Sequence, residues 1–462
     1  MKKTFEVISP ASNSVLYSRE YMDSATVDAA VAAARQAQPA WAATPLAERK
    51  AKVSAAVDWL VAHQNEVAQA ITESMGRPIS QSPGEVRGLE ERARYMLSIA
   101  DEALADVVPQ EKEGFKRFLR REALGVVLVV APWNYPFLTA VNSIVPALVS
   151  GNTVLLKHSS QTPVVGELFQ AAFDAAGLPT GVFRNIVLTH EDTDRILQSD
   201  DIDFVAFTGS VNGGHQIQKS ISERFIGAGL ELGGKDPAYV RADADVAFAA
   251  ENLVDGAFFN SGQSCCGIER IYVHESVYDE FVAEFVRVTQ QYRLGDPQDA
   301  NTNLGPMVKV SSADFVRAQI KEALEQGAES LVDESLFPAS QAGTAYLAPH
   351  VLVNVNHDMR VMTEESFGPV IGIMKVSGDE EAVRLMNDSD FGLTASVWTQ
   401  DSDAAMALAA QIQTGTVFMN RCDYLDPALA WTGVKNTGHG VSLSVLGYAQ
   451  LTRVKSYHFR TA

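Results

Sequence analysis

Cysteine is scarce in this chain of 462 residues, which contains only Cys265, Cys266 and Cys422. The three form no CxxC pair, and no histidine stands at a zinc-binding spacing from them. The sequence therefore predicts no metal site. We also expect no structural disulfide, since a reducing compartment keeps such thiols free.

Long apolar runs are missing too. The longest extends from Ala123 to Trp133 and has 11 residues, whereas a membrane span needs about 20, so we expect a buried strand there. Residues 1–6 contain lysines but no apolar core of a secretory signal. The sequence predicts a cytoplasmic location and no membrane partner.

Positive charge is in deficit. Lysine and arginine total 37 against 57 aspartates and glutamates, which gives a net charge of −20. Such a surface repels phosphate backbones, so we expect no nucleic-acid partner. Hydrophobic residues make up 46% of the chain, as in folded proteins. The length exceeds one ordinary core and predicts two or three domains.

The hydrophobic pattern changes along the chain. Residues 5–20 alternate around a turn, which predicts a hairpin, and residues 24–105 have helical spacing. From residue 126 onward, short apolar runs alternate with helical stretches, which predicts a doubly wound parallel sheet. Strands are expected at 126–130, 154–156, 185–188 and 204–207, and helices at 137–149, 162–176 and 192–197. A second α/β series follows from about 235 to 436.

Polar or tightly turning residues follow three of these strands. They are Pro132-Trp133-Asn134, Lys157-His158-Ser159-Ser160 and Thr208-Gly209-Ser210. Ligands of doubly wound sheets bind beyond the carboxyl ends of the strands. We therefore expect a binding crevice along this edge.

Cys265 and Glu231 point most directly to a chemical activity. Cys265 follows Gly262-Gln263-Ser264, in a loop expected between a helix at 246–260 and a strand at 270–273. Glu231 stands thirty-four residues earlier, ahead of Leu232-Gly233-Gly234-Lys235. A thioester-forming enzyme needs a thiol that attacks a carbonyl and a carboxylate that activates water to release the acyl group. The same pair would serve a thiol hydrolase, and a buried cysteine is often inert.

Eight motifs give the chain a resemblance to the aldehyde dehydrogenase superfamily, in family order and over nearly the whole length. They are Pro132-Trp133-Asn134-Tyr135-Pro136, Gly151-Asn152-Thr153-Val154-Leu155-Leu156-Lys157, Phe207-Thr208-Gly209-Ser210, Glu231-Leu232-Gly233-Gly234-Lys235, Gly262-Gln263-Ser264-Cys265, Glu364-Glu365-Ser366-Phe367-Gly368-Pro369, Asn387 ahead of Gly392-Leu393, and Gly433-Val434-Lys435.

The resemblance implies an α/β protein with three parts and a homodimeric or homotetrameric assembly. A doubly wound parallel-sheet cofactor domain would comprise residues 1–105, 124–233 and 436–452. A second α/β catalytic domain would comprise 234–435. A small β oligomerisation arm would comprise 106–123 and 453–462.

The implied activity is oxidation of a small-molecule aldehyde to a carboxylic acid with NAD or NADP. By resemblance, Cys265 attacks the aldehyde and carries a thiohemiacetal and then a thioester. The Asn134 amide donates to the oxyanion, and Glu231 activates the water that releases the acid. A CoA-acylating enzyme has no need of Glu231, and a catalytically silent member has no need of any of these groups, so both alternatives rank lower.

The resemblance also implies a set of cofactor-binding residues, although the GxGxxG motif is absent. Lys157 would reach the adenosine ribose, and Glu365 the nicotinamide ribose. Gly209, Ser210 and Gly214 would open a helix toward the pyrophosphate. Phe367 would pack beside the nicotinamide ribose, and Trp133 lines the crevice or belongs to the core.

The chain departs from the family at several positions. Ser160 stands where NAD-preferring members have a glutamate, and a hydroxyl can donate to a 2′-phosphate, so we expect NADP to be accepted. The segments 430–433 and 440–442 also differ. We expect the first to bear on substrate shape and neither to touch the chemistry.

Substrate preference is the least determined feature. Asn142 stands where succinic-semialdehyde members often have an arginine, which weakens the case for a carboxylated substrate. Asp423 and Asp426 would either attract an amino-aldehyde or lie as solvated loop charges. Cys266 and Cys422 are expected to pack rather than react.

Overall fold

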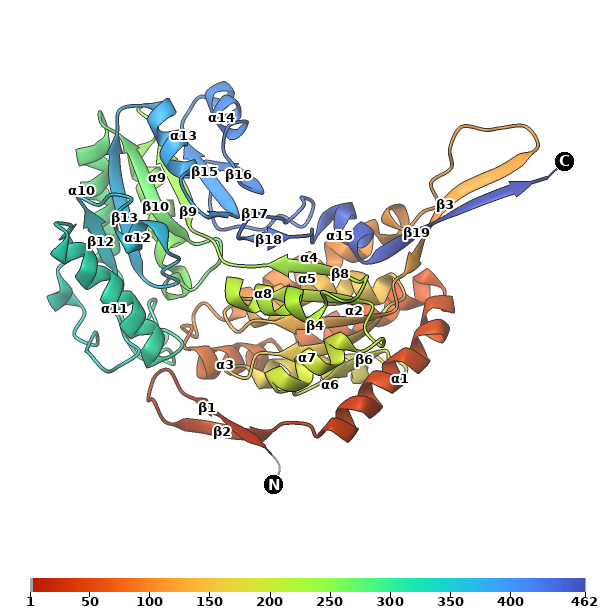
Figure 1. Ribbon diagram of the computed structural model, residues 1–462. Coiled ribbons are helices and arrows are strands. Elements are labelled where there is room, and N and C mark those ends of the chain that lie inside the picture. Colours follow the sequence, from red (N-terminus) through yellow and green to blue (C-terminus); the bar gives the residue numbers. More distant parts are fainter. Residues whose placement is uncertain (1–2, 462) are drawn as a thin grey trace.

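The computed structural model describes residues 3–461, whose strands form two large sheets and three two-stranded ribbons (Figure 1). The first large sheet has the strand order β18-β8-β7-β4-β5-β6. Strands β4 to β8 pair in parallel, and β18 joins β8 antiparallel. The bounds are β4 (Val126–Ala131), β5 (Thr153–His158), β6 (Phe183–Asn185), β7 (Phe204–Thr208), β8 (Gly227–Glu231) and β18 (Gly438–His439).

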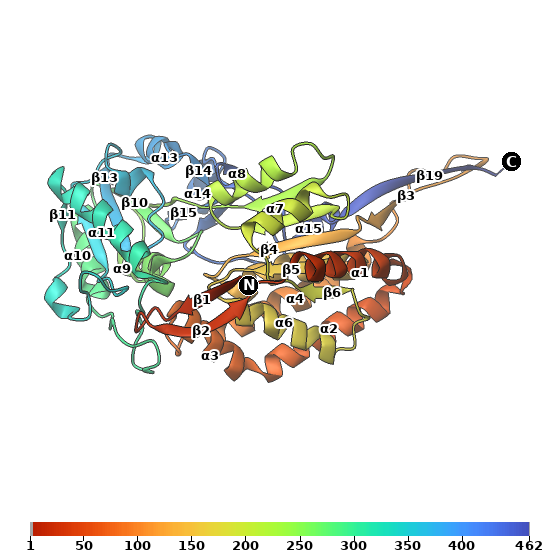
Figure 2. The ribbon, with the colours of Figure 1, turned by 60° about the horizontal axis from the view of Figure 1, so that its bottom comes forward.

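The apolar run at β4 is continuous because both faces of this sheet are covered. Val126, Leu128 and Val130 pack into one hydrophobic cluster, and the alternate residues Val127 and Val129 into another. Figure 2 shows α7 and α8 above the sheet and α2, α3 and α6 below it. The helices are α1 (Ser24–Ala43), α2 (Leu46–Ala62), α3 (Gln64–Met75), α4 (Pro83–Ala103), α5 (Pro136–Val149), α6 (Pro163–Ala175), α7 (His190–Gln198), α8 (Val211–Ser220) and α15 (Ser444–Gln450).

The second large sheet has the order β11-β12-β13-β10-β9-β15-β16 and is parallel except for β11. Its strands are β9 (Asp236–Val240), β10 (Ile268–His274), β11 (Glu329–Ser330), β12 (His350–Val353), β13 (Val370–Val376), β15 (Thr394–Trp398) and β16 (Thr416–Met419). Its helices are α9 (Val246–Phe258), α10 (Tyr278–Thr289), α11 (Val310–Glu325), α12 (Arg360–Thr363), α13 (Asp379–Asn387) and α14 (Ser402–Ala409), with the short 3-10 turns η1 (Phe259–Gly262) and η2 (Glu334–Leu336).

The chain passes from the first sheet to the second through the four residues between Glu231 and Asp236. This crossing contains Gly233-Gly234 and places the end of β8 beside the start of β9. The chain later returns toward the first sheet through β17 (Val434–Lys435), which pairs with β14 (Phe391–Gly392). The predicted α/β architecture is confirmed, while the exact division into domains stays a prediction.

A two-stranded ribbon projects from the body in both views (Figures 1 and 2). It consists of β3 (Phe115–Ala123) and β19 (Thr452–Arg460), paired antiparallel over their full length. Phe118 and Tyr457 stack across it with ring centroids 4.4 Å apart. The ribbon covers most of the predicted arm, and Val454 and Phe459 remain exposed on it.

Several local predictions can be compared with the structure. The predicted hairpin is present as β1 (Thr4–Ile8) and β2 (Val15–Glu20). The strand expected at 185–188 lies at 183–185, because Val187 instead accepts a hydrogen bond from the Met22 N–H. Within residues 3–461, none of the helices combines the length and the apolar character that crossing a membrane requires.

Candidate active site

The Cys265 loop follows α9 and begins with an unusual backbone. The helix ends at Phe258, two residues earlier than predicted, because Asn260 and Ser261 adopt left-handed φ angles of 53° and 57°. Gly262 continues with φ 70°, and a Cβ there would lie 2.3 Å from the Gly368 oxygen. Non-glycine residues in this region are strained and persist only where the surroundings hold them.

Side-chain hydrogen bonds hold the loop in place. Asn260 Nδ2 donates to the carbonyl oxygens of Asn134 and Gln263, each at 3.2 Å. Ser261 Oγ donates to Gly305 at 2.8 Å, and Gln263 Oε1 accepts from the Val308 N–H at 2.7 Å. The half-buried Cys265 is therefore carried by a loop with little freedom to move.

Asn134 lies beside this loop at the end of β4. Its side chain is 5% exposed, and its Nδ2 donates to the Gln263 carbonyl at 3.2 Å. Its own carbonyl accepts from Arg77. The Arg77 guanidinium also donates to Asn260 Oδ1 and pairs with Glu85, and this pair is almost completely buried.

Sequence reasoning missed the Arg77–Glu85 pair. Glu85 Oε1 accepts the N–H groups of Phe137 and Leu138 at 2.7 and 3.2 Å, at the start of α5. The pair thus ties α4, α5 and the Cys265 loop together. The only available signal was a lone arginine between Gly76 and Pro78, where a helix ends at a glycine of φ 83°.

Glu231 ends β8 and is held from two sides. Its Oε1 accepts a hydrogen bond from Ser442 Oγ at 2.6 Å, and its Oε2 one from Thr208 Oγ1 at 3.3 Å. Burial raises the pKa of Glu231, and the hydrogen bonds from Ser442 and Thr208 oppose that rise. Segment 440–442, which we expect to leave the chemistry untouched, therefore contacts the Glu231 carboxylate directly through Ser442.

The two departing segments of the C-terminal region lie side by side. Trp431 and Ser442 exchange two backbone hydrogen bonds of 2.9 Å. Trp431 lines a cavity next to Cys265, and Ser442 reaches Glu231. The departures from the family in these two segments therefore affect both a wall residue of the cavity, Trp431, and the hydrogen-bond donor to Glu231, Ser442.

Glu365 and Phe367 face the Gly233-Gly234 crossing. Glu365 Oε1 accepts the Gly234 N–H at 2.9 Å, and a Cβ on Gly233 would lie 2.5 Å from Glu365 Oε2. A Cβ on Gly234 would lie 2.1 Å from the Cys265 oxygen, so only glycines allow this approach. Burial, with the nearby Glu269 charge, raises the pKa of Glu365 to about 8.

A buried ion pair supports the Glu365 segment from behind. Lys235 Nζ lies 2.6 Å from Glu269 Oε2, and the Glu269 carboxylate accepts the N–H groups of Ser366 and Phe367, both at 2.8 Å. Phe367 in turn meets Trp133 edge-to-face at 5.7 Å. Trp133 is half-buried, so it both packs against the hydrophobic core and lines the crevice.

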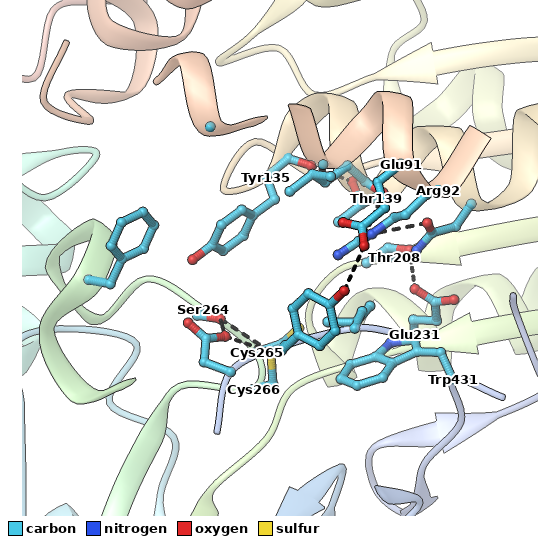
Figure 3. Close-up of a pocket in the computed structure, with 18 of the residues that line it drawn as sticks. Glu91, Arg92, Tyr135, Thr139, Thr208, Glu231, Ser264, Cys265, Cys266 and Trp431 are labelled. Carbon is cyan, nitrogen blue, oxygen red and sulfur yellow. Dashed lines mark hydrogen bonds between the residues drawn. The ribbon is translucent and has the colours of Figure 1, made fainter. Parts of the chain in front are cut away.

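Two cavities meet at Cys265. The larger, of about 410 Å³, is lined by aromatic and charged side chains that include Tyr135, Arg92 and Trp431 (Figure 3). The smaller, of about 200 Å³, is lined by residues that include Asn134, Gly209 and Glu365. Both cavities share the same four residues: Thr139, Thr208, Glu231 and Cys265.

A thiol and a carboxylate between two cavities agree with what the sequence comparisons find. The model of the aldehyde dehydrogenase family matches residues 1–457. The chain belongs to the aldehyde dehydrogenase family. It is an oxidoreductase, an NAD(P)-dependent aldehyde dehydrogenase, and the predicted resemblance is confirmed.

Relatives and solved structures support this assignment over nearly the full chain. A vanillin dehydrogenase of Corynebacterium glutamicum is 34% identical over 94% of this chain and 89% of its own length. A succinic semialdehyde dehydrogenase of Streptococcus pyogenes, solved with NADP+, is 29% identical with a TM-score of 0.93 and coverages of 99% and 100%. An NAD-dependent aldehyde dehydrogenase of Sinorhizobium meliloti is 31% identical with a TM-score of 0.94 and coverages of 99% and 92%.

The remaining predicted cofactor residues lie in three places. Gly209 and Ser210 line the smaller cavity, and Ser210 caps α8 by accepting the Gly213 N–H at 3.2 Å. Lys157 and Ser160 line a separate small recess of about 10 Å³ at the end of β5. Gly214 lies inside α8, where a Cβ would meet Leu232 at 2.7 Å. Its lack of a side chain lets α8 pack against Leu232, the residue after β8, and its predicted place beside the cofactor stays a prediction.

The other two cysteines and the loop aspartates also have defined positions. Cys266 Sγ lies 3.0 Å from Asp423 Oδ1, which also accepts from Ser264 Oγ. Hydrogen bonding with Cys265 and burial hold the pKa of the Cys266 thiol well above its usual value. Asp423 lines the larger cavity, whereas Asp426 is exposed. Cys422 is tucked against Gly256.

Proposed function

We propose that Cys265 is the nucleophile that attacks the aldehyde carbon. Its position as a wall of both cavities supports this, because the substrate would enter from one side and the cofactor from the other. Attack by the thiolate forms a thiohemiacetal, and loss of hydride leaves a thioester on Cys265. The neighbouring Cys266 is a poor competitor, since its raised pKa keeps it a thiol.

Asn134 is proposed to stabilise the oxyanion together with the Cys265 backbone N–H. The buried Nδ2 faces the nucleophile loop and at 3.2 Å makes only a long hydrogen bond to Gln263. The Arg77–Glu85 pair fixes the backbone on which Asn134 stands. One such preorganised donor typically contributes about 3 kcal/mol to transition-state stabilisation.

Glu231 is proposed to activate the water that releases the acid. A carboxylate whose pKa is raised by burial is a stronger base than an exposed one. The hydrogen bonds from Ser442 and Thr208 orient it and favour its ionised form, against the effect of burial. Since the carboxylate lines both cavities, it reaches the thioester side of Cys265 without crossing a packed wall.

The residues of the smaller cavity fit the nicotinamide end of a dinucleotide. Glycines at 209 and 233 leave the backbone open, the free N–H groups at the start of α8 suit a phosphate, and the Glu365 carboxylate suits ribose hydroxyls. When bound, NAD(P)+ supplies the hydride acceptor. Lys157 and Ser160 are proposed to hold the adenosine ribose, and the exposed Ser160 hydroxyl leaves room for NADP.

Turnover measurements with single variants test this mechanism. Cys265→Ala is expected to abolish NAD(P)H formation while cofactor binding persists, and Cys266→Ala serves as the matched thiol control that retains turnover. Glu231→Gln is expected to give a burst of NAD(P)H followed by slow cycling, because hydride transfer precedes release of the acid. A burst-free Glu231→Gln variant with normal turnover contradicts its role. Hydrolysis of an ester, without NAD(P)H formation from any aldehyde, indicates a thiol hydrolase.

Assembly and location remain predictions. The projecting β3–β19 ribbon, with exposed Val454 and Phe459, supports a homodimer or homotetramer. The cytoplasmic location stays a prediction.

A further inference from the structure

Arg92 on α4 is a buried cation without an ionic partner. Its side chain is 9% exposed and lines the larger cavity. Nη1 donates to the Leu138 carbonyl at 2.9 Å and to Asn142 Oδ1 at 3.4 Å. Within residues 3–461, no carboxylate lies at ion-pair distance from it and no group accepts from Nε or Nη2. Figure 3 shows Arg92 on the same side of the cavity as Thr139 and Glu91.

Burying an unpaired guanidinium costs free energy, because hydrogen bonds within the protein replace only part of the hydration free energy that is lost. Burial lowers the pKa of Arg92, and the charges of Glu231 and Glu85 compensate only in part. Arginine nevertheless keeps its proton in proteins. The side chain therefore presents two unused donor nitrogens, fixed by the Nη1 bonds, next to an open volume.

We propose that Arg92 binds a carboxylate carried by the aldehyde substrate while Cys265 takes the carbonyl at the other end. The planar fork of Nε and Nη2 matches the two oxygens of a carboxylate. Arg92 and Cys265 line the same cavity, so a short chain can span them. The substrate class is an ω-oxo carboxylate, and this rests on the proposed role of Cys265.

The assignment revises an expectation drawn from Asn142. An amide at that position weakened the case for a carboxylated substrate, yet the structure brings a guanidinium from α4 to within 3.4 Å of the same amide. The positive charge is present in that part of the cavity and comes from another helix.

The acidic residues of the cavity have partners or lie at its rim. Glu91 is exposed and accepts the Tyr424 hydroxyl at 2.7 Å. Asp423 accepts from Ser264 and Cys266, and burial raises its pKa. Burial also raises the pKa of Asp255 to about 6. Hydrogen-bond donors thus engage Glu91 and Asp423 already and offset part of the negative charge that these groups present to an incoming carboxylate.

The test compares 4-oxobutanoate with its methyl ester, which keeps the shape and removes the charge. The wild type is expected to prefer the carboxylate in kcat/KM. Arg92→Gln should lower kcat/KM for the carboxylate by about 30-fold or more, mainly through KM, and leave the ester unchanged. Arg92→Lys should recover part of the loss. Arg87→Gln, at an exposed position of the same helix and cavity, is the matched control and should retain the preference.

Three results overturn the proposal. In the first, the wild type has a higher kcat/KM for the ester or a neutral aromatic aldehyde, and in the second it has a higher kcat/KM for an amino-aldehyde. In the third result, Arg92→Gln lowers kcat/KM for the carboxylate and the ester equally, which assigns Arg92 a structural role in joining α4 to α5. Failure of the proposed function looks different, since then neither substrate yields NAD(P)H in any variant.

Discussion

Ser442→Ala gives the sharpest test of how the Glu231 carboxylate is controlled. The substitution removes the 2.6 Å hydrogen bond to Oε1 and leaves the weaker 3.3 Å bond from Thr208 to Oε2. A hydrogen bond to a charged group contributes about 1.5 to 3 kcal/mol. All of that stabilises the ionised carboxylate, because Ser442 donates to it.

The direction of the effect follows from the sign of the pKa shift. Burial already raises the pKa of Glu231, and the Ser442 bond opposes the rise. Without Ser442 the pKa rises further, so the ionised fraction on the acidic side falls by about tenfold or more. The proposed role of Glu231 in activating water needs the ionised carboxylate. On that proposal, the acidic limb of the deacylation rate should move to higher pH.

The assay separates the two half-reactions. The NAD(P)H burst should keep its amplitude in Ser442→Ala, while steady-state turnover drops at neutral pH and recovers at alkaline pH. Thr208→Val is the graded control, and its smaller displacement should match the longer bond. A steady-state pH profile of Ser442→Ala that superimposes on that of the wild type refutes the reasoning.

Two further predictions concern stability. Arg77→Met leaves Glu85 buried and unpaired and should lower the unfolding free energy by about 3 to 5 kcal/mol in urea titrations. The control Arg94→Met breaks a surface pair with Asp58 and should cost about 1 kcal/mol or less. Equal losses in the two variants would contradict a stabilising role of the buried Arg77–Glu85 pair. Glu365 keeps its proton up to about pH 8 in the folded state and loses it far earlier when unfolded, so its contribution to stability declines as pH rises toward 8. Glu365→Gln should flatten that decline, and an unchanged slope excludes Glu365 as its source.

Much of the architecture could be predicted from the sequence because its causes are local. The continuous apolar run at β4 requires cover on both faces, and the helical stretches around it supply that cover. Cys265 and Asn134 each follow a distinctive glycine or turn motif, and Glu231 precedes a double glycine, so their positions at the crevice were accessible to pattern reasoning.

The residues that sequence reasoning missed act across elements. Arg77, Ser442 and Arg92 have ordinary neighbours along the chain, and their importance arises only when α4, the Cys265 loop and segment 440–442 come together. Gly214 has a packing reason that the sequence alone did not reveal, because a side chain there would collide with Leu232.

The four residues common to both cavities have a kinetic consequence. Each cavity reaches its own exposed residues, Arg87 and Glu91 on one side and Ser210 on the other. In the proposed arrangement, the substrate uses the larger cavity and the dinucleotide the smaller one, so the acid could depart while the dinucleotide is still bound. Substrate and dinucleotide then do not block each other's access to Cys265. An inhibitor long enough to extend past Cys265 would occupy both cavities and compete with both reactants.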